Sequence, residues 1–367
     1  MSNVIALCAT DMWYLRNFRL ALVKNLVNQY DKVVLIAGYD GHELFLDSIS
    51  DKVVIINSNL DRKSIGVFNN LKLLKRYFEI FKNIKPQKVI NFTIKPNVFS
   101  GFVCWVLNIP FINNITGLGT AFLSSSLLRY VVILMFKFIF PRANYVIFQN
   151  TDDMNLISKY VNNSNFKLIE GSGVNPNYFK PTSDFKGRIY DFVFIGRLIK
   201  DKGIREFLYA ATKILKEFPD LRIKVVGDID LNNASSLTSK EYESYKENSK
   251  IELPGFSNDV KAILNESKCV VLPSYREGLS RVLLEAASMS CALIASDVPG
   301  CTQVLSNDNG LLCKARSSES LHQAMSNMAK LKIDEQETLG RRGRDLVLNR
   351  FSIDIINTEI IYLLGKL

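Results

Sequence analysis

Short apolar segments rich in β-branched residues alternate along the chain with longer segments in which apolar side chains recur every three or four positions. The first kind is typical of buried strands, and the second is typical of helices that pack on a sheet. Their alternation is the βαβ pattern of a parallel sheet. In the first half of the chain, the pattern predicts strands at 4–9, 33–37, 53–57, 89–92, 111–115, 145–149 and 166–169, and helices at 17–29 and 67–80.

The pattern is interrupted once and then restarts. A Gly171-Ser172-Gly173 turn and a polar connector at 181–190 separate the two runs. We therefore expect one domain at 1–180, a second at 181–350, and a separate helical segment at 351–367. The second run predicts strands at 192–195, 222–226, 269–272 and 292–296, and helices at 204–217, 257–265 and 280–289.

Length and composition agree with two globular α/β domains. A chain of 367 residues exceeds the roughly 250 to 300 at which single cores stop growing. With 47% hydrophobic and 22% charged residues, the chain does not belong to the disordered or collagen-like classes. Six cysteines without a Cys-x-x-Cys pair, and only two histidines, favour reduced core thiols over a zinc site. The first residues lack the basic and apolar regions of an export signal.

The positive charge is concentrated in the first half. Residues 1–180 hold 20 Lys and Arg against 11 Asp and Glu, whereas the remainder holds 26 against 25. A basic domain can face nucleic acid, an anionic membrane or phosphorylated substrates, and composition alone does not choose among them.

Two apolar stretches of the first half bear on membrane contact. The uncharged stretch 96–128 is broken by Pro110 and by several Asn and Gly residues, so it is not a membrane-spanning helix. The stretch 127–140 is more apolar, but Arg129 and Lys137 interrupt it, and about 14 helical residues span only ~21 Å. It is either a buried helix of the first domain or a helix lying in the membrane interface.

The most informative segment for chemistry is 271–286, VLPSYREGLSRVLLEA, in which a buried strand leads through a turn into a helix. The backbone N–H groups of Gly278, Leu279 and Ser280 at the start of that helix would form an anion site suited to a diphosphate. Glu277 and Glu285 lie about two helical turns, or ~12 Å, apart. Each carboxylate can accept two hydroxyls, as a ribose or a pyranose offers. Two glutamates at this spacing alone are a weak signal.

A second candidate segment, FIGRLIKDKG at 194–203, combines a strand end, a glycine turn and cations. Doubly wound sheets present groups to ligands at such a position. Gly196 would open the turn, and Arg197 and Lys202 would supply positive charge to a departing diphosphate. The alternative is an ordinary solvated basic loop.

Two other motifs do not predict chemistry. Asp228-Ile-Asp230 imitates the Asp-x-Asp metal motif of enzymes with another architecture, but it follows the Val225-Val-Gly227 strand end of a Rossmann-like domain, and we expect no metal site. A Gly-x-Gly-x-x-Gly turn after a strand, with an acid downstream, is missing from the sequence, which removes the dinucleotide dehydrogenase interpretation.

The second domain resembles the retaining glycosyltransferases of family 4. The matching stretches within 190–315 are FIGRLIKDKG, KVVGDID, LPGF, VLPSYREGLSRVLLEA, IASDVPGCTQVL and NGLLC. The resemblance implies an α/β fold of two Rossmann-like doubly wound domains facing across a cleft (GT-B), with 351–367 crossing back onto the first domain. It implies that Arg197 and Lys202 bind the donor diphosphate, Glu277 the donor sugar and Glu285 the ribose, with Arg197, Lys202 and Glu277 catalytic.

The first domain resembles the branch of this family that extends lipid-diphosphate-linked sugars in bacterial polysaccharide assembly. The stretches that carry this are WYLRNFRLALV, TIKPN, NNITGLGT and VIFQN. The chain departs from the common pattern because its first strand leads into Asp11-Met-Trp instead of a Gly-Gly loop, and neither His42 nor His322 occupies the usual site-lining position. The acceptor-side residues that the resemblance implies are Thr93, Lys95, Asn97, Thr116, Gly117 and Gly119.

These observations predict a retaining, metal-independent hexosyltransferase without a cofactor. We expect it to move a sugar, with an N-acetylhexosamine as one candidate, from a UDP-sugar to an undecaprenyl-diphosphate-linked saccharide in O-antigen or capsule biosynthesis. The expected location is cytoplasmic, on the anionic inner face of the bacterial cell membrane, without a nucleic-acid partner. Two alternatives stay open: a nucleotide-sugar epimerase or hydrolase on the same fold, and a basic nucleic-acid-binding protein. The TIKPN motif argues against the first, and the lack of interleaved aromatic residues argues against the second.

Overall fold

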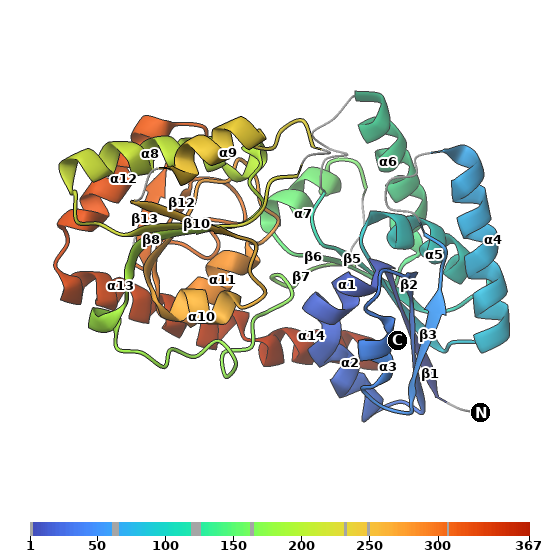
Figure 1. Cartoon of the computed structure of the whole chain (residues 1–367). Helices are drawn as coiled ribbons and strands as arrows, with labels where there is room; N and C mark the ends of the chain where they lie inside the picture. Colours follow the sequence, from blue (N-terminus) through green and yellow to red (C-terminus); the bar gives the residue numbers. More distant parts are fainter. Residues whose placement is uncertain are drawn as a thin grey trace. The chain divides into compact units, whose positions relative to one another are not determined.

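The computed structural model describes residues 3–60, 66–118, 126–161, 165–230, 233–247, 250–306 and 308–367. The chain divides into two compact units, which are visible in Figure 1. Unit 1 comprises Met1–Ser172 and Ile353–Leu367, and unit 2 comprises Gly173–Ser352. Each unit is a parallel sheet with helices on both faces, so the prediction of two Rossmann-like doubly wound domains is confirmed.

Unit 1 contains a seven-stranded sheet in the order β3-β2-β1-β4-β5-β6-β7. All neighbouring strands are parallel. The strands that the apolar pattern predicted are all present, with ends that differ by at most two residues. Their bounds are β1 Val4–Asp11, β2 Lys32–Gly38, β3 Val53–Asn57, β4 Lys88–Phe92, β5 Phe111–Ile115, β6 Tyr145–Phe148 and β7 Phe166–Leu168.

Successive side chains of the central strand β1 enter two different cores. Ala6 and Cys8 pack under one helical layer, whereas Ile5 and Leu7 pack under the other. The first layer consists of α4 (Val67–Ile84), α5 (Ile94–Val106) and α6 (Ser126–Ile139). The opposite face is covered by α2 (Leu20–Val27) and α14 (Ile353–Gly365). The remaining helices of unit 1 are α1 Met12–Tyr14, α3 Glu43–Asp47 and α7 Thr151–Ser158.

The predicted helix 17–29 is the part of unit 1 where the structure differs most from the sequence pattern. Residues Leu15–Arg19 form a π-helical turn, and the α-helix α2 begins only at Leu20. Single π-turns of this kind are frequent at functional sites. The turn brings Arg19 inside the unit, where the side chain is 1% exposed.

Unit 2 contains a six-stranded parallel sheet in the order β10-β9-β8-β11-β12-β13. The four inner strands were predicted, whereas β10 and β13 at the two edges were not. Both edge strands are short, and β10 contains Pro254, a residue that sheets tolerate at an edge. The bounds are β8 Tyr190–Ile195, β9 Ile223–Val226, β10 Ile251–Gly255, β11 Ser267–Leu272, β12 Ala292–Ser296 and β13 Gly310–Cys313.

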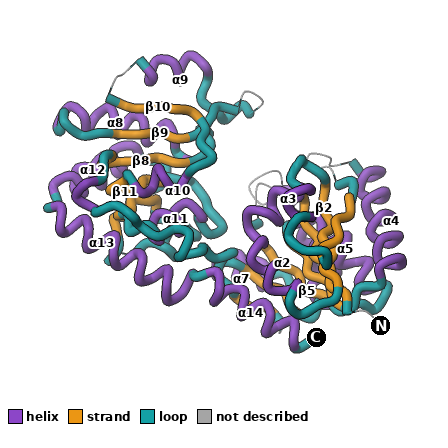
Figure 2. The backbone as a smooth tube through the Cα atoms, turned by 60° about the horizontal axis from the view of Figure 1, so that its bottom comes forward, coloured by secondary structure: helices purple, strands orange, loops and turns teal. Residues whose placement is uncertain are grey.

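Helices cover both faces of this sheet as well, and Figure 2 shows the strands of each unit between them. Phe192 and Phe194 of β8 contact the α8 and α12 layer, whereas Val193 and Ile195 contact the α10 and α11 layer. The bounds are α8 Ile204–Glu217, α9 Ser239–Lys246, α10 Val260–Asn265, α11 Arg281–Ser288, α12 Ser318–Lys330 and α13 Ile333–Leu346.

The division between the units falls within the Gly171-Ser172-Gly173 turn, eight residues before the sequence-based boundary at 180. Gly171 and Gly173 have φ angles of 80° and 72°, a region that favours glycine. The chain returns to unit 1 after Ser352, and α14 places Ile360 and Leu364 in the core of that unit.

Candidate active site

The sheet of unit 2 reverses its order between β8 and β11. β9 and β10 follow on one side of β8, whereas β11 lies on the other side. Open α/β sheets bind ligands in the crevice at the carboxyl ends of the strands at such a reversal. Both segments selected from the sequence leave from this edge, because 196–203 follows β8 and 273–280 follows β11.

The two segments are packed directly against each other. Gly203 has a φ angle of 71°, and a Cβ atom there would lie 2.1 Å from the carbonyl oxygen of Pro273. The backbone N–H of Tyr275 donates to the carbonyl oxygen of Asp201 at 2.9 Å. Only glycine allows this close approach, so Gly203 fixes the position of the cationic loop relative to the loop that carries Glu277.

Lys202 and Glu277 form an ion pair at this junction. The Lys202 Nζ lies 2.5 Å from the Glu277 Oε1, and the Ser274 hydroxyl donates to the same oxygen at 2.7 Å. The two charged side chains are 26% and 11% exposed. An ammonium group has three donors, so Lys202 can still donate to an anion while it orients the Glu277 carboxylate.

Arg197 stands apart from this pair. Its side chain is exposed, and it makes no hydrogen bond or ion pair with any residue that the structure describes. The neighbouring Gly196 leaves its surroundings open, because a Cβ atom there would meet only the ring of Phe194, at 3.7 Å. A charged ligand can therefore approach the backbone and the guanidinium together at this strand end.

Glu285 is held by Arg281 one turn earlier on α11. The Arg281 Nε donates to the Glu285 Oε1 at 2.6 Å, and the side chains are 35% and 8% exposed. Burial raises the pKa of Glu285, while the charge and hydrogen bond of Arg281 act in the opposite direction. Arg281 thus favours the ionised carboxylate in a site that disfavours charge.

The backbone N–H groups at the start of α11 were expected to form an anion site, but at least one of them makes a hydrogen bond within the protein. Ser280 caps the helix, and its hydroxyl accepts from Leu283 N–H at 3.4 Å. The N–H of Ser280 itself donates to the carbonyl of Gly300 at 3.2 Å, so it is occupied in this structure. Gly300 has a φ of 80°, and a Cβ there would lie 2.5 Å from the Gly278 carbonyl oxygen.

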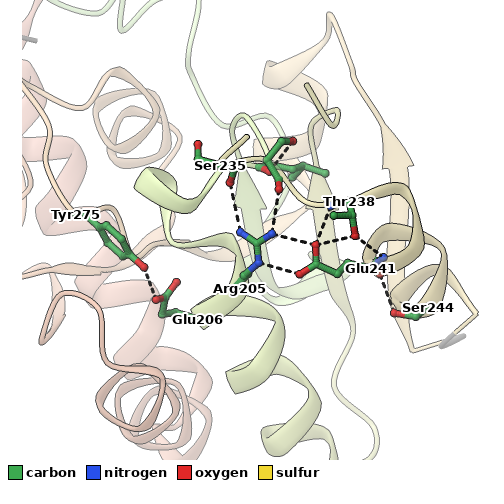
Figure 3. A network of polar contacts seen from close by, with 9 residues as sticks. Arg205, Glu206, Ser235, Thr238, Glu241, Ser244 and Tyr275 are labelled. Atoms are coloured by element: carbon green, nitrogen blue, oxygen red, sulfur yellow. Dashed lines mark hydrogen bonds and ion pairs between the residues drawn. The ribbon is translucent and has the colours of Figure 1, made fainter. Parts of the chain in front are cut away.

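Tyr275 and Glu206 anchor the Glu277 loop to α8, and sequence reasoning missed both. The Tyr275 hydroxyl donates to the Glu206 Oε1 at 2.5 Å, as Figure 3 shows. The guanidinium of Arg316 lies 4.9 Å from the centre of the Tyr275 ring. Burial, together with the Glu206 carboxylate, raises the pKa of Tyr275 to about 12. The tyrosine in the PSYREG turn could have indicated such a contact, because the hydroxyl of a partly buried tyrosine usually has a hydrogen-bond partner.

The preceding residue of α8, Arg205, anchors the segment before α9. Arg205 donates to both carboxylate oxygens of Glu241 at 2.9 Å (Figure 3). Its second terminal nitrogen also donates to the Ser236 carbonyl at 2.9 Å. Glu241 completes a capping box with Thr238 at the start of α9. The Arg205 hydrogen bond is the main reason why the pKa of Glu241 falls to about 2.

The Asp228-Ile-Asp230 segment lies between β9 and this anchored segment. The backbone N–H of Asp230 donates to the Ser236 hydroxyl at 2.9 Å, and Asp228 is exposed. Within the described ranges, no group of three or more His, Cys, Asp or Glu side chains is placed to hold a metal ion.

The sheet of unit 1 also reverses its order, between β1 and β4. At this edge the hydroxyls of Thr10 and Thr93 lie 2.6 Å apart and form a hydrogen bond. Thr93 has a φ angle of 67°, which is unusual for a residue other than glycine and marks local backbone strain. Lys95 follows in the first turn of α5 and is half-buried.

The other acceptor-side residues occupy different environments. Asn97 is fully buried, and its side chain both donates to the Asn114 carbonyl at 3.0 Å and accepts from the Asn114 N–H at 3.2 Å. It therefore ties α5 to β5. Thr116 and Gly117 follow β5 and are partly exposed, with Gly117 at a φ of 129°. Gly119 lies outside the described residues.

Tyr14 and Arg19 lie near the same edge of unit 1 and were missed by the sequence analysis. Arg19 donates from Nε and from one terminal nitrogen to the Tyr14 hydroxyl oxygen, at 3.1 and 3.0 Å. Its guanidinium also lies 4.4 Å from the centre of the Phe92 ring, at the end of β4. The only sequence signal was an arginine inside an apolar helical pattern. Such an arginine is usually exposed, so the pattern did not predict a buried one.

Two family models match most of the chain. The model described as glycosyl transferases group 1 matches residues 179–346. The model described as glycosyl transferase 4-like matches residues 4–150. The first match contains all the candidate residues of unit 2, and the second contains all those of unit 1.

Two curated relatives align over most of their own length. An N,N'-diacetylbacillosaminyl-diphospho-undecaprenol alpha-1,3-N-acetylgalactosaminyltransferase of Campylobacter jejuni is 26% identical over 84% of this chain and 85% of the relative. A UDP-Gal:alpha-D-GlcNAc-diphosphoundecaprenol alpha-1,3-galactosyltransferase of Escherichia coli is 25% identical over 79% of this chain and 78% of the relative.

Solved structures share the fold of the whole chain. The Anabaena protein Alr3699/HepE in complex with UDP and glucose superimposes with a TM-score of 0.82 over 100% of both chains, at 15% identity. Sucrose-phosphate synthase of Thermosynechococcus elongatus gives a TM-score of 0.80 over 99% of this chain and 98% of the other, at 18% identity.

Proposed function

The chain belongs to the glycosyltransferases, with a group 1 second unit and a 4-like first unit, and on this premise we propose its reaction. It transfers a sugar from a UDP-sugar to an undecaprenyl-diphosphate-linked saccharide, with retention of configuration, in bacterial O-antigen or capsule biosynthesis. The acceptor class is supported by the relatives of Campylobacter and E. coli, whose names specify diphospho-undecaprenol acceptors. The donor class is supported by the Anabaena neighbour, which was solved with UDP and glucose.

The observation that carries this proposal is the Lys202–Glu277 ion pair at the β8/β11 reversal, with Arg197 exposed on the same loop. A nucleotide-sugar donor combines a diphosphate with a hydroxyl-rich sugar. The two cations match the diphosphate, and the oriented carboxylate of Glu277 matches the sugar hydroxyls. The buried Glu285 would accept the ribose hydroxyls.

The main chemical task is to stabilise negative charge on the diphosphate as it leaves. Lys202 would do so from the position that Glu277 fixes, and Arg197 would add its charge once the diphosphate is bound. Preorganised charge is the largest single contribution in many enzymes. We propose that these cations act without a metal ion. The sugar would pass through an oxocarbenium-like state, and its developing positive charge would lie near Glu277.

The helix α6 supports a peripheral position on the membrane. Its inner face joins the core of unit 1, so the interpretation as a buried helix is right for that face. The outer face is apolar and yet exposed to solvent, which is the arrangement of a helix that rests in a membrane interface. The buried side chains are Val132, Ile133, Phe136 and Ile139, and the exposed ones are Tyr130, Val131, Leu134 and Phe138.

Charge supports the same position. Between Glu79 and Asp152 the sequence holds seven Lys and Arg residues and no acidic residue. Arg129 and Lys137 of α6 are exposed beside its apolar side chains. We therefore propose that the exposed face of α6, where Arg129 and Lys137 lie beside apolar side chains, rests on the anionic cytoplasmic leaflet instead of on nucleic acid. The docked protein would meet its lipid-linked acceptor at the surface of that leaflet.

No helix among the described residues has the length and apolar character needed to cross a bilayer.

The reaction is tested by incubating the protein with UDP-sugars, with and without an undecaprenyl-diphosphate-linked saccharide in vesicles. We expect the lipid-linked product to gain one sugar and UDP to be released only when the acceptor is present. Epimerised donor, or free sugar released at the same rate without acceptor, would contradict the transferase and favour the epimerase or hydrolase alternative. A donor that stays intact in both arms would contradict all three.

Membrane docking is tested by vesicle sedimentation. Arg129→Glu/Lys137→Glu should weaken binding to anionic vesicles, and high salt should weaken binding of the unmodified protein, because salt screens exposed charges. Lys246→Glu/Lys330→Glu is a matched control, since it makes the same charge change on exposed positions of unit 2. Equal sedimentation of the two double variants would contradict docking through α6.

A further inference from the structure

An apolar groove of about 340 Å³ lies on unit 1 between α4, α5 and α6. These helices form one layer over the sheet, in which α5 contacts both α4 and α6 (Figure 1). Leu74 of α4, Phe99 and Phe102 of α5, and Leu134 and Phe138 of α6 contribute to its lining.

The lining is partly open to solvent. Leu134 and Phe138 are 45% and 42% exposed, although both are large apolar residues. Trp105, on the last turn of α5, packs edge-on against Phe102 and Phe138, with ring centres 5.6 and 5.3 Å apart. Arg142 stacks over Phe138 at 4.0 Å and over Trp105 at 4.5 Å. The groove is therefore apolar inside, aromatic at one end, and flanked by a cation.

One helix connects this groove with the ligand edge of unit 1. α5 begins at Ile94, directly after Thr93 at the β1/β4 reversal, and carries Lys95 in its first turn. Val98 and Phe99, which line the groove, follow within one further turn, or ~5 Å of helix length. A ligand with an anionic head at the reversal could thus place an attached chain along α5 and into the groove.

We propose that this groove binds the first isoprene units of the acceptor's polyprenyl chain, next to its diphosphate. The inference rests on the proposed function for the identity of the acceptor. An isoprenoid diphosphate combines an anionic head with an apolar, branched tail. The lining of the groove is apolar and suits the tail, and Lys95 in the first turn of α5 lies at the reversal, where it suits the anionic head.

The groove also separates two roles of α6. Tyr130 and Val131 face solvent outside the groove, whereas Leu134 and Phe138 belong to its lining. Docking on a bilayer would use the first pair together with the exposed cations. Binding of the polyprenyl chain would use Leu134 and Phe138, and it would not require a bilayer. A dissolved prenyl diphosphate should therefore bind as well.

The test measures binding in buffer without vesicles or detergent, by calorimetry, with inorganic pyrophosphate, geranyl diphosphate and farnesyl diphosphate below its micellar concentration. We expect farnesyl diphosphate to bind at least about tenfold more tightly than pyrophosphate, with geranyl diphosphate between them, because each buried methylene favours binding. Leu134→Gln/Phe138→Gln should reduce that preference to about threefold or less. Both positions are half-exposed, so the fold should tolerate the change.

Leu71→Gln is the matched control. Leu71 is 57% exposed on α4, one turn before Leu74, and it does not line the groove. This variant should keep the preference for the longer chain. A preference that survives in the Leu134→Gln/Phe138→Gln variant, or that is lost equally in Leu71→Gln, would overturn the proposal.

A competitor distinguishes the polyprenyl chain from an ordinary lipid. Dodecyl phosphate should displace farnesyl diphosphate only weakly, and displacement at equal concentration would make the groove a general acyl-chain site and overturn the proposal. The proposed reaction is judged separately. Chain preference without sugar transfer to any lipid-linked saccharide would contradict the reaction alone, whereas transfer without chain preference would contradict the groove alone.

Discussion

Glu285 is the residue whose replacement should most weaken binding of UDP. Its side chain is 8% exposed, so a ribose that lost this partner would leave hydroxyls unpaired in a nearly closed site. An unsatisfied buried polar group costs about 1 to 3 kcal/mol. At about 1.4 kcal/mol for each factor of ten, Glu285→Ala should raise the Kd for UDP by roughly 5- to 150-fold.

The Arg281 contact adds a pH dependence to this prediction. Burial raises the pKa of Glu285, and Arg281 partly offsets that rise. The ionised carboxylate is the better acceptor for two hydroxyls, so UDP affinity should fall as pH is lowered through the raised pKa. Arg281→Gln removes the opposing charge, so the fall should begin at a higher pH than in the unmodified protein.

Titration calorimetry with UDP between pH 5 and pH 8 measures both effects. Glu252→Gln is the control, because Glu252 is a half-exposed acid of unit 2 that pairs with Lys224 and Tyr190. It should leave the Kd unchanged. An unchanged Kd in Glu285→Ala, with a normal melting temperature, would refute the placement of the ribose. A pH profile that does not move in Arg281→Gln would refute the role of the ion pair.

Three further outcomes are expected. Arg197→Ala should lower kcat by about 10²- to 10³-fold, since its charge is needed most as the diphosphate departs, and a variant with near-normal turnover would remove Arg197 from the mechanism. Turnover should survive EDTA because Lys202 and Arg197 supply the positive field, and a loss reversed by Mg²⁺ or Mn²⁺ would overturn that proposal. Gly203→Ala should destabilise unit 2 by at least about 1 kcal/mol in thermal unfolding, because alanine is strained at a φ of 71° and would meet the Pro273 carbonyl. Gly187→Ala, which has nothing within 4 Å of its Cβ position, should have little effect.

The inner strands of both sheets could be predicted because burial on both faces makes them continuous apolar runs. The edge strands β10 and β13 were missed, although the edge strands β3 and β7 were predicted, because Glu252 and Pro254 interrupt the apolar pattern of β10 and β13 has only four residues. The first residue of a helix was also hard to predict from the apolar pattern. The helix expected from residue 257 begins at Val260, because the Asp259 side chain accepts from Ala262 N–H and caps it there.

The candidate site of unit 2 could be assembled from sequence because its two segments follow neighbouring strands. The pairing of Lys202 with Glu277 could not, since the partners are 75 positions apart and meet only through the close contact at Gly203. Arg19 was missed for a related reason. An arginine in an apolar pattern is normally exposed, and only the π-helical turn and the Tyr14 hydroxyl explain how it is buried.

The return of the chain to unit 1 through α14 sets an order for folding during synthesis. Ile360 and Leu364 of α14 fill the core beside α2, and Lys88 donates to the Leu364 carbonyl at 2.7 Å. The ribosome makes this helix only after all of unit 2, a delay on the order of ten seconds or more at about 5 to 20 residues per second. Unit 2 can therefore close first, although unit 1 starts first. During that interval the apolar surface awaiting α14 is exposed to solvent, where chaperones or premature aggregation would act on it.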